Sequence, residues 1–152
     1  VETATCIAVS SRLVSRFQTI VQVQRLQSGE YERAEQILGQ LAAHPDTALV
    51  VDGPSLQFLM DHYESAFASI ASALPAVVCC RCTPTQKADV ARLLQRRTGR
   101  RVACIGDGGN DVSMIQAGNV GVGIVGKEGR QASLAADVSI EAFSHLLRLI
   151  LW

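Results

Sequence analysis

Hydrophobic residues recur along the chain in two patterns that change near residue 47. Residues 1–46 are largely polar, with helix-like periodicity over residues 2–15 and 31–43 and an expected edge strand over residues 20–26. From residue 48 onward, short apolar runs and Gly- or Pro-containing turns alternate with segments whose apolar residues recur every three or four positions. This alternation of strands and helices predicts an α/β protein.

Short apolar runs are the predicted strands of the sheet. Most of them are continuous rather than alternating, as a parallel sheet covered by helices on both faces requires. We expect a Rossmann-like three-layer arrangement in a single domain that spans residues 1–152. The predicted strands are residues 48–51, 76–80, 102–105, 120–124 and 138–140.

The segments between these strands are predicted helices with one apolar face. The helix that follows the strand at residues 76–80 is predicted to begin at Thr83-Pro84, because proline is favoured at the first position of a helix. The helix that precedes this strand is expected to be continuous, with an apolar face of Leu56, Leu59, Met60, Tyr63, Phe67 and Ile70.

Charge and composition exclude several classes of protein. The 152 residues include 14 basic and 14 acidic side chains, and the basic ones are scattered, so we expect no nucleic-acid partner. No apolar run approaches the ~20 residues needed to cross a bilayer, and Val1-Glu2-Thr3-Ala4 lacks an initiator Met and the organisation of a signal peptide. We therefore expect a soluble segment cut from a longer protein.

The five cysteines lie mostly in apolar runs, which predicts reduced thiols in a cytosolic compartment. Cys79, Cys80 and Cys82 lie close together in the sequence. Neighbouring residues of a strand point to opposite faces, however, and no second pair of ligands follows at a distance. A zinc site is therefore not expected.

The strongest candidate chemistry lies in residues 106–111, Gly-Asp-Gly-Gly-Asn-Asp. Asp107 would leave the end of a strand and Asp111 would start the next helix, at the edge of a parallel sheet where ligands bind. Two carboxylates beside glycines that permit close approach are typical ligands of a Mg²⁺ ion shared with a phosphate. The alternative, a glycine turn in which Asp111 caps a helix, leaves Asp107 unexplained.

Two basic residues complete this candidate site. Lys87 falls in the first turn of the helix that begins at Thr83-Pro84, where a cation opposes the helix dipole, so a functional role is favoured. We expect Lys87 to point into the same crevice as Asp107 and to neutralise a phosphoryl group, with Arg81 as a second phosphate contact. The alternative for both is an exposed surface charge.

Gly121, Gly123 and Gly126 spell the G-x-G-x-x-G pattern of dinucleotide-binding proteins. The first two glycines fall within a predicted strand rather than after it, and no acidic residue follows at the expected distance. We therefore expect no dinucleotide site, and interpret these glycines as allowing the neighbouring crevice loop to pass close to the strand.

Taken together, these motifs resemble a known family. Residues 106–112 resemble the G-D-G-x-N-D hinge motif of P-type ATPases, and residues 1–4 resemble the stretch after their T-G-D-K motif. Residues 79–87, 111–116 and 128–132 favour the phospholipid-flippase (type IV) branch. Gly108-Gly109 and residues 129–136 are most similar to its Neo1-like subfamily. The resemblance covers nearly the whole chain.

The resemblance implies the C-terminal part of a phosphorylation domain with a haloacid-dehalogenase-like fold. In that family the residues matching Lys87 and Asp107 are catalytic: the lysine contacts the phosphoryl group and the aspartate binds Mg²⁺. Asp111 and Asn110 complete the metal and nucleotide surroundings, and Arg81 matches an arginine that contacts ATP. The implied ligands are therefore Mg²⁺ at Asp107 and Asp111, and ATP at Arg81, Lys87, Asn110 and Asp111.

The parent enzyme would hydrolyse ATP through an aspartyl-phosphate and move phospholipid from the outer or lumenal leaflet to the cytosolic one. The chain would be a cytosolic domain of a Golgi or endosomal membrane protein, with the remaining domains of that protein as its partners. No D-K-T-G-T motif occurs, so the phosphate-accepting Asp and its strand are missing. We therefore expect an incomplete sheet and an isolated chain without ATPase activity.

Two alternatives remain. One is a stand-alone Mg²⁺-dependent phosphatase of the same superfamily, whose only candidate nucleophile is Asp52, in a segment that lacks a second Asp two residues on. The other is a non-catalytic module that self-associates. Because the missing strand leaves two inner edges of the sheet unpaired, we expect the chain to rejoin its strands or to pair with another copy.

Overall fold

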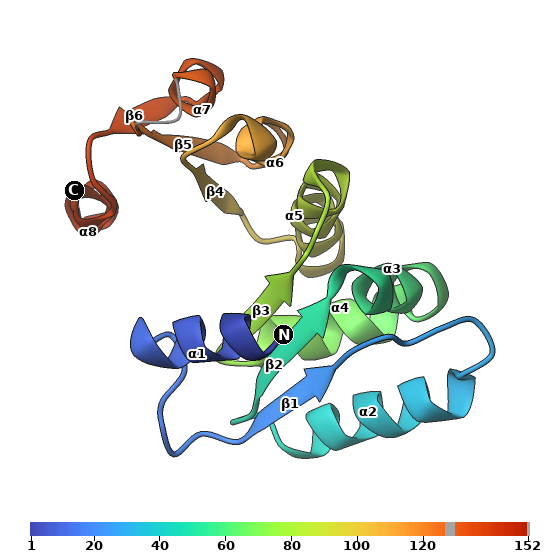
Figure 1. Ribbon diagram of the computed structural model, residues 1–152. Coiled ribbons are helices and arrows are strands. Elements are labelled where there is room, and N and C mark those ends of the chain that lie inside the picture. The colour runs from blue at the N-terminus through green and yellow to red at the C-terminus, as the bar shows by residue number, and fades with distance from the viewer. Residues whose placement is uncertain (127–129, 152) are drawn as a thin grey trace. The chain divides into compact units, whose positions relative to one another are not determined.

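A computed structural model describes residues 1–126 and 130–151 of the chain (Figure 1). The chain folds as two compact units, Val1–Cys82 and Thr83–Trp152. Each unit contains parallel strands connected by helices, which confirms the α/β class. That the whole chain is one domain stays a prediction, and each unit is described by itself.

The first unit contains a three-stranded parallel sheet in the order β1-β2-β3. The predicted strand at residues 20–26 is present at the edge of this sheet, but it ends at Val23. All residues of the central strand β2 are buried. The elements are α1 (Glu2–Ser10), β1 (Ile20–Val23), α2 (Tyr31–Ala43), β2 (Ala48–Asp52), α3 (Gly53–His62), α4 (Glu64–Ala73) and β3 (Val77–Cys80).

Helices cover both faces of this sheet. On one face, Ala8 of α1 and Val14 pack with Ala48 and Ala76 in a buried cluster. The alternate residues of β2, which face the other side, are also fully buried, and α3 packs against β2 and β3. Layers of helix, sheet and helix therefore make up this unit, as predicted.

Two predicted helices end earlier than their sequence periodicity indicates. The helix expected over residues 2–15 ends at Ser10, and Arg12 then adopts a left-handed φ of 61°. The continuous helix predicted across Tyr63 is wrong, because α3 and α4 are separated at this residue, whose φ of −131° is not helical. The Tyr63 hydroxyl lies 3.2 Å from Glu35 Oε1 on α2, a tertiary contact that the local pattern does not contain.

The second unit contains a separate parallel sheet in the order β4-β5-β6. Its strands lie within one residue of the predicted positions. The elements are α5 (Pro84–Thr98), β4 (Ala103–Gly106), the 3₁₀ helix η1 (Gly109–Asp111), α6 (Val112–Ala117), β5 (Val120–Ile124), α7 (Gln131–Ala135), β6 (Val138–Ile140), η2 (Phe143–His145) and α8 (Leu146–Leu151).

Two glycines of β5 allow helices to approach the backbone of the sheet. A Cβ atom at Gly121 would lie 2.7 Å from Ile115 of α6, and one at Gly123 would lie 2.7 Å from the carbonyl oxygen of Ala132 in α7. Both glycines lie within the strand, as predicted, which is inconsistent with a dinucleotide fingerprint. The segments that pass close to these two glycines are helices, and not the crevice loop that we expected. The third glycine of the pattern, Gly126, does lie near that loop, since a Cβ atom there would be 3.5 Å from the Asp107 carbonyl oxygen.

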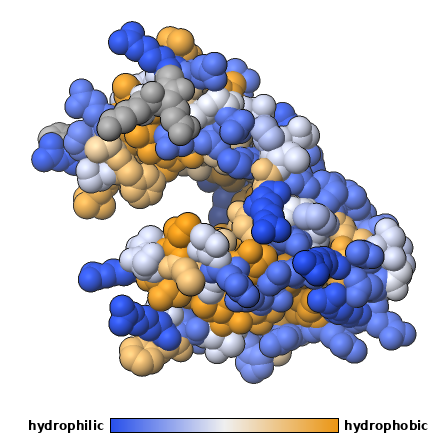
Figure 2. Space-filling model, viewed as in Figure 1, coloured by the Kyte–Doolittle hydropathy of each residue, from blue (hydrophilic) through white to orange (hydrophobic). Residues whose placement is uncertain are grey.

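Apolar side chains interrupt the polar surface of the protein (Figure 2). In α8 the exposed residues include Leu147, Ile150 and Leu151, with exposed fractions of 65%, 70% and 75%. Exposed apolar groups of this size are typical of a surface that another segment or molecule covers. No helix among the described residues combines the length and the apolar character required to span a membrane.

The strands form two sheets, so the expectation of one rejoined sheet is wrong for this structure. Among the described strands, β3 pairs only with β2, and β4 pairs only with β5. The last strand of the first sheet, β3, and the first strand of the second sheet, β4, are therefore both edge strands. Those two edges have unpaired backbone groups, as expected if a central strand is missing.

Hydrogen exchange should distinguish these edges from the sheet centres. We expect slow exchange in the central strands β2 and β5, and rapid exchange at the amides of β3 and β4 that point away from their partner strands. The measurement is residue-resolved hydrogen exchange at several protein concentrations. Slow exchange at those outer amides would contradict open edges, and slowing that grows with concentration would show that copies of the chain pair through them.

Candidate functional site

The start of α5 is fixed by a reciprocal pair of hydrogen bonds. The Thr83 hydroxyl accepts from the Gln86 backbone N–H at 3.2 Å, and the Gln86 side-chain oxygen accepts from the Thr83 N–H at 3.0 Å. Pro84 occupies the first helical position, as predicted. This arrangement holds Lys87 in the first turn, where its own N–H bonds the Thr83 carbonyl at 3.1 Å.

An ion pair joins α5 to the loop that follows β4. Lys87 Nζ lies 2.8 Å from Asp111 Oδ1, and the two side chains are 35% and 14% exposed. The other oxygen of Asp111 accepts a hydrogen bond of 3.3 Å from the Asp107 backbone N–H. The structure therefore brings Lys87, Asp107 and Asp111 together, and Lys87 is not an isolated surface charge.

The glycines around this loop allow its close contacts. A Cβ atom at Gly106 would lie 2.8 Å from Asp111 Cγ and 2.9 Å from its Oδ2, so only glycine leaves room for this carboxylate. A Cβ atom at Gly109 would overlap the side-chain oxygen of Gln131 in α7. We did not predict a role for Gln131, because nothing in the local pattern shows that α7 reaches this loop.

Asp107 is the carboxylate of the loop that no described residue binds. Its side chain is exposed at the carboxyl end of β4, with no hydrogen bond or ion pair to the described parts of the chain. Asn110 is also exposed, within η1. Glu128 and Gly129, which belong to the motif at residues 128–132, lie outside the described residues.

The residues present fit a hard cation such as Mg²⁺. Asp107 offers an uncommitted carboxylate, and Asp111, four residues on, lies against the Asp107 backbone. Across residues 1–126 and 130–151, no group of three or more His, Cys, Asp or Glu side chains is arranged to hold a metal ion. Mg²⁺ commonly takes only one or two carboxylates from a protein and completes its shell with water and phosphate oxygens.

Arg81 and Asp52 belong to the first unit, where the structure places them near each other. Burial tends to raise the pKa of Asp52, which is 8% exposed, but hydrogen bonds from Ser55 and Arg25 and the charge of Arg81 outweigh it and hold this pKa below its usual value. The Asp52 oxygens accept from the Ser55 and Arg25 N–H groups, each at 3.0 Å. Asp52 therefore caps α3, and both oxygens of the candidate phosphatase nucleophile are occupied.

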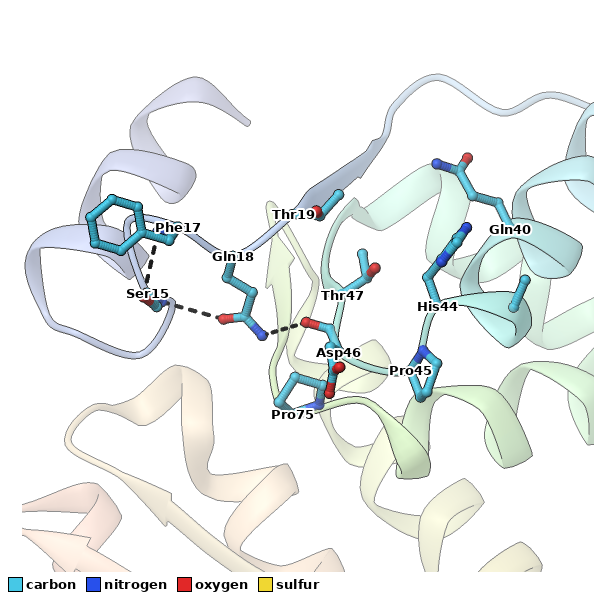
Figure 3. A pocket seen from close by; sticks show the side chains of 11 residues that line it. Ser15, Phe17, Gln18, Thr19, Gln40, His44, Pro45, Asp46, Thr47 and Pro75 are labelled. Carbon is cyan, nitrogen blue, oxygen red and sulfur yellow. Dashed lines mark hydrogen bonds between the residues drawn. The ribbon is translucent and has the colours of Figure 1, made fainter.

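A hollow of about 790 Å³ lies at the other end of the first sheet (Figure 3). Thr19, Thr47 and Pro75, which precede the three strands, contribute to its lining. Gln18 crosses it and donates a hydrogen bond of 2.8 Å to the Asp46 carbonyl. None of the predicted site residues lines this hollow, and it lies at the amino ends of the strands, away from Asp52.

Comparison with known proteins gives the family. The chain is 56% identical over 152 residues to Phospholipid-transporting ATPase neo1 of Schizosaccharomyces pombe, covering 100% of this chain and 14% of that protein. It is 53% identical over 155 residues to Phospholipid-transporting ATPase NEO1 of Saccharomyces cerevisiae, again over 100% of this chain and 13% of that protein. Over its whole length, the chain is therefore similar to a segment of the phospholipid-transporting ATPases.

The similarity extends to animal members of the phospholipid-transporting ATPases. The human Probable phospholipid-transporting ATPase IIB is 55% identical over 150 residues, which cover 99% of this chain and 13% of that protein. No protein-family model matches the chain. The chain spans about a seventh of the length of these relatives, 13–14%. The resemblance to the Neo1-like flippases is thereby confirmed.

Replacing Asp52 by Ala should destabilise the chain by about 1–3 kcal/mol at neutral pH, because α3 loses its cap and the Arg25 N–H loses its partner. Since the pKa of Asp52 is lowered on folding, this stabilisation is complete above the unfolded pKa of about 3.9 and is lost as the pH falls through the folded value. Denaturant unfolding at several pH values measures it.

The control for this substitution is Asp61→Ala, which removes an exposed carboxylate of α3 that accepts a hydrogen bond from the Gln57 side chain on the same helix. It should change the free energy of unfolding by less than about 0.5 kcal/mol. A loss in Asp52→Ala that is the same at acidic and neutral pH would contradict the charged cap.

Replacing Gly106 by Ala should displace the Asp111 carboxylate, because the added methyl group would occupy its place. We expect a loss of about 1–3 kcal/mol in unfolding free energy and shifted amide resonances at Asp107 and Asp111. Gly39→Ala, in open space within α2, is the matched control and should be neutral or stabilising. Unshifted resonances in Gly106→Ala would show that the close contact is not formed in solution.

Proposed function

We propose that this chain is the C-terminal part of the phosphorylation domain of a phospholipid-transporting P-type ATPase, and that it supplies Mg²⁺- and phosphate-binding residues to the ATP site. The observation that carries the proposal is the ion pair of Lys87 with Asp111 beside the uncommitted carboxylate of Asp107. All three lie at the carboxyl end of a parallel strand or at the start of a helix, where phosphate ligands bind.

Each residue has a distinct role in this proposal. Asp107 would hold Mg²⁺ together with Asp111, and the ion would neutralise charge on the transferred phosphoryl group. The Lys87 ammonium, now held by Asp111, would balance a further phosphoryl charge. Asn110 and Arg81 would bind ATP, since an exposed amide and a planar guanidinium suit ribose and phosphate oxygens.

The open edges of the two sheets support an incomplete domain. β3 and β4 each have one described partner strand, and the chain has no D-K-T-G-T segment. We infer that a strand of the same ATPase outside this chain carries the phosphate-accepting Asp and pairs with these edges. Because phosphoryl transfer through a covalent intermediate needs that nucleophile, the isolated chain is inactive. Pairing between copies through the same edges is the alternative that hydrogen exchange tests.

The transport activity belongs to the whole ATPase. The relatives are named as phospholipid-transporting, and most of their length lies outside the part that matches this chain. In the proposed cycle, ATP hydrolysis through an aspartyl-phosphate drives phospholipid to the cytosolic leaflet of a Golgi or endosomal membrane. This chain would be part of the cytosolic machinery of that cycle.

A chimaeric protein tests the proposal. This chain replaces the aligned segment of the Saccharomyces cerevisiae relative, to which it is 53% identical. The measurements are the rate of ATP hydrolysis and the amount of acid-stable phosphoenzyme. We expect the chimaera to be active. Asp107→Asn and Lys87→Met in it should each lower the rate of hydrolysis by about 100-fold, because each removes charge stabilisation of the phosphoryl group.

Asp61→Asn, an exposed position on α3, is the control and should leave hydrolysis unchanged. The isolated chain, incubated with labelled ATP and Mg²⁺, should carry no phosphate. An inactive chimaera that is folded would refute the role of the segment. Full activity of Asp107→Asn would remove this residue from the metal site, and phosphate on the isolated chain would show that it contains its own nucleophile.

A further inference from the structure

Cysteines that the proposed ATP site does not use lie at the end of β3. Cys79 and Cys80 are the last residues of this strand, and Cys82 is the last residue of the first unit. Between them, Arg81 adopts a φ of 56°, a left-handed conformation that is uncommon for a residue with a side chain. This turn brings Cys82 back over the strand end, with its sulfur 3.8 Å from the Cys80 carbonyl oxygen.

The turn also brings two of the thiols together. The side chains of Cys79 and Cys82 interact with each other, so the two thiols lie near one another at the end of β3. Cys79 is exposed and Cys82 is half-buried, and every cysteine of the chain is a thiol in this structure. Cys80 precedes the turn and, as the strand neighbour of Cys79, points to the opposite face of the sheet.

The spacing of this pair is Cys-x-x-Cys, which is the spacing of dithiol sites that cycle between thiols and a disulfide. A metal site is the other common use of the spacing, but the described residues contain no further ligands near this pair that could complete one. The interaction between the two side chains and the reversed backbone at Arg81 therefore favour a redox pair.

We propose that Cys79 and Cys82 form a reversible disulfide by exchange with glutathione disulfide. The Cys82 thiolate attacks one sulfur of glutathione disulfide, which forms a mixed disulfide and releases one glutathione. Cys79 then loses its proton and attacks the Cys82 sulfur, which releases the second glutathione. Two protein thiols are oxidised, one glutathione disulfide is reduced, and the two thiol protons pass to the two glutathione molecules.

The order of attack follows from the contact between the two thiols. The hydrogen bond with Cys82, followed by burial, raises the pKa of Cys79, so Cys79 is the thiol of the pair that keeps its proton. The thiolate is the attacking form of a cysteine, and therefore Cys82 reacts first and Cys79 resolves the mixed disulfide.

The position of this pair determines what the disulfide would change. Thr83, which caps α5, follows Cys82 directly, and Arg81 lies inside the ring that the disulfide closes. Oxidation would therefore fix the backbone turn at the covalent junction of the two units. The disulfide does not depend on the ATP site, so it stands or falls separately from the proposed function.

The test uses the purified chain in glutathione buffers of increasing oxidised fraction, followed by alkylation, trypsin digestion and mass spectrometry. Trypsin cleaves after Arg81, so a disulfide between Cys79 and Cys82 joins the two peptides on either side of this cleavage site. Where cleavage does not occur, the single peptide is two mass units lighter than its reduced form. We expect this product in the wild-type chain and equally in Cys80→Ser, where Cys79 is the one cysteine left beside Cys82 in the tryptic peptide that precedes it.

The single variants give the order of attack. Cys79→Ser should accumulate glutathione on Cys82, and Cys82→Ser should leave Cys79 unmodified under the same conditions. Cys6, an exposed cysteine of α1, serves as the internal control for non-specific glutathione attachment. Three results would each overturn the proposal. They are absence of the bridge in the wild-type chain, its loss in Cys80→Ser, and glutathione attachment to Cys82 that is no faster than attachment to Cys6.

Discussion

The geometry of the candidate site depends on the Asp111 carboxylate. One of its oxygens binds the Lys87 ammonium and the other accepts from the Asp107 backbone, so one side chain joins a helix start to the end of a strand. This contact exists only because Gly106 presents no side chain to Asp111. Because Asp111 is held in this way, Asp107 is an exposed carboxylate near the ammonium group of Lys87. A carboxylate and an ammonium group in this arrangement suit Mg²⁺ and phosphate.

Glycine residues also allow helices to pack closely against the second sheet. Gly121 and Gly123 in β5 allow α6 and α7 to lie against the strand at backbone distance, and α7 then places Gln131 over Gly109. These two short helices can pack there because the approach is so close. In the first unit a carboxylate has the comparable structural role, since Asp52 ties the loop after β1 to the start of α3.

The open edges of β3 and β4 show that a chain can pack well and still present unpaired strands. Each unit buries its own core, but backbone groups at these edges have no partner among the described strands. An unpaired strand edge is a template for another strand, and the phospholipid-transporting ATPases contain many residues beyond this segment. Cys79 and Cys82, for which we propose a reversible disulfide, lie at the end of β3 and at the last residue of the first unit.

The sequence alone determined the strands, the start of α5 and the residues of the loop at 106–111, because apolar runs, the Thr83-Pro84 cap and glycine spacing are local signals. It could not show the break at Tyr63 or the approach of Gln131 to Gly109, since both depend on contacts between elements far apart in the chain. The partner of Lys87 was likewise decided by the tertiary structure. The helix dipole argument indicated a functional role for this cation, but only the packing of α5 against α6 and η1 selected Asp111 as its partner.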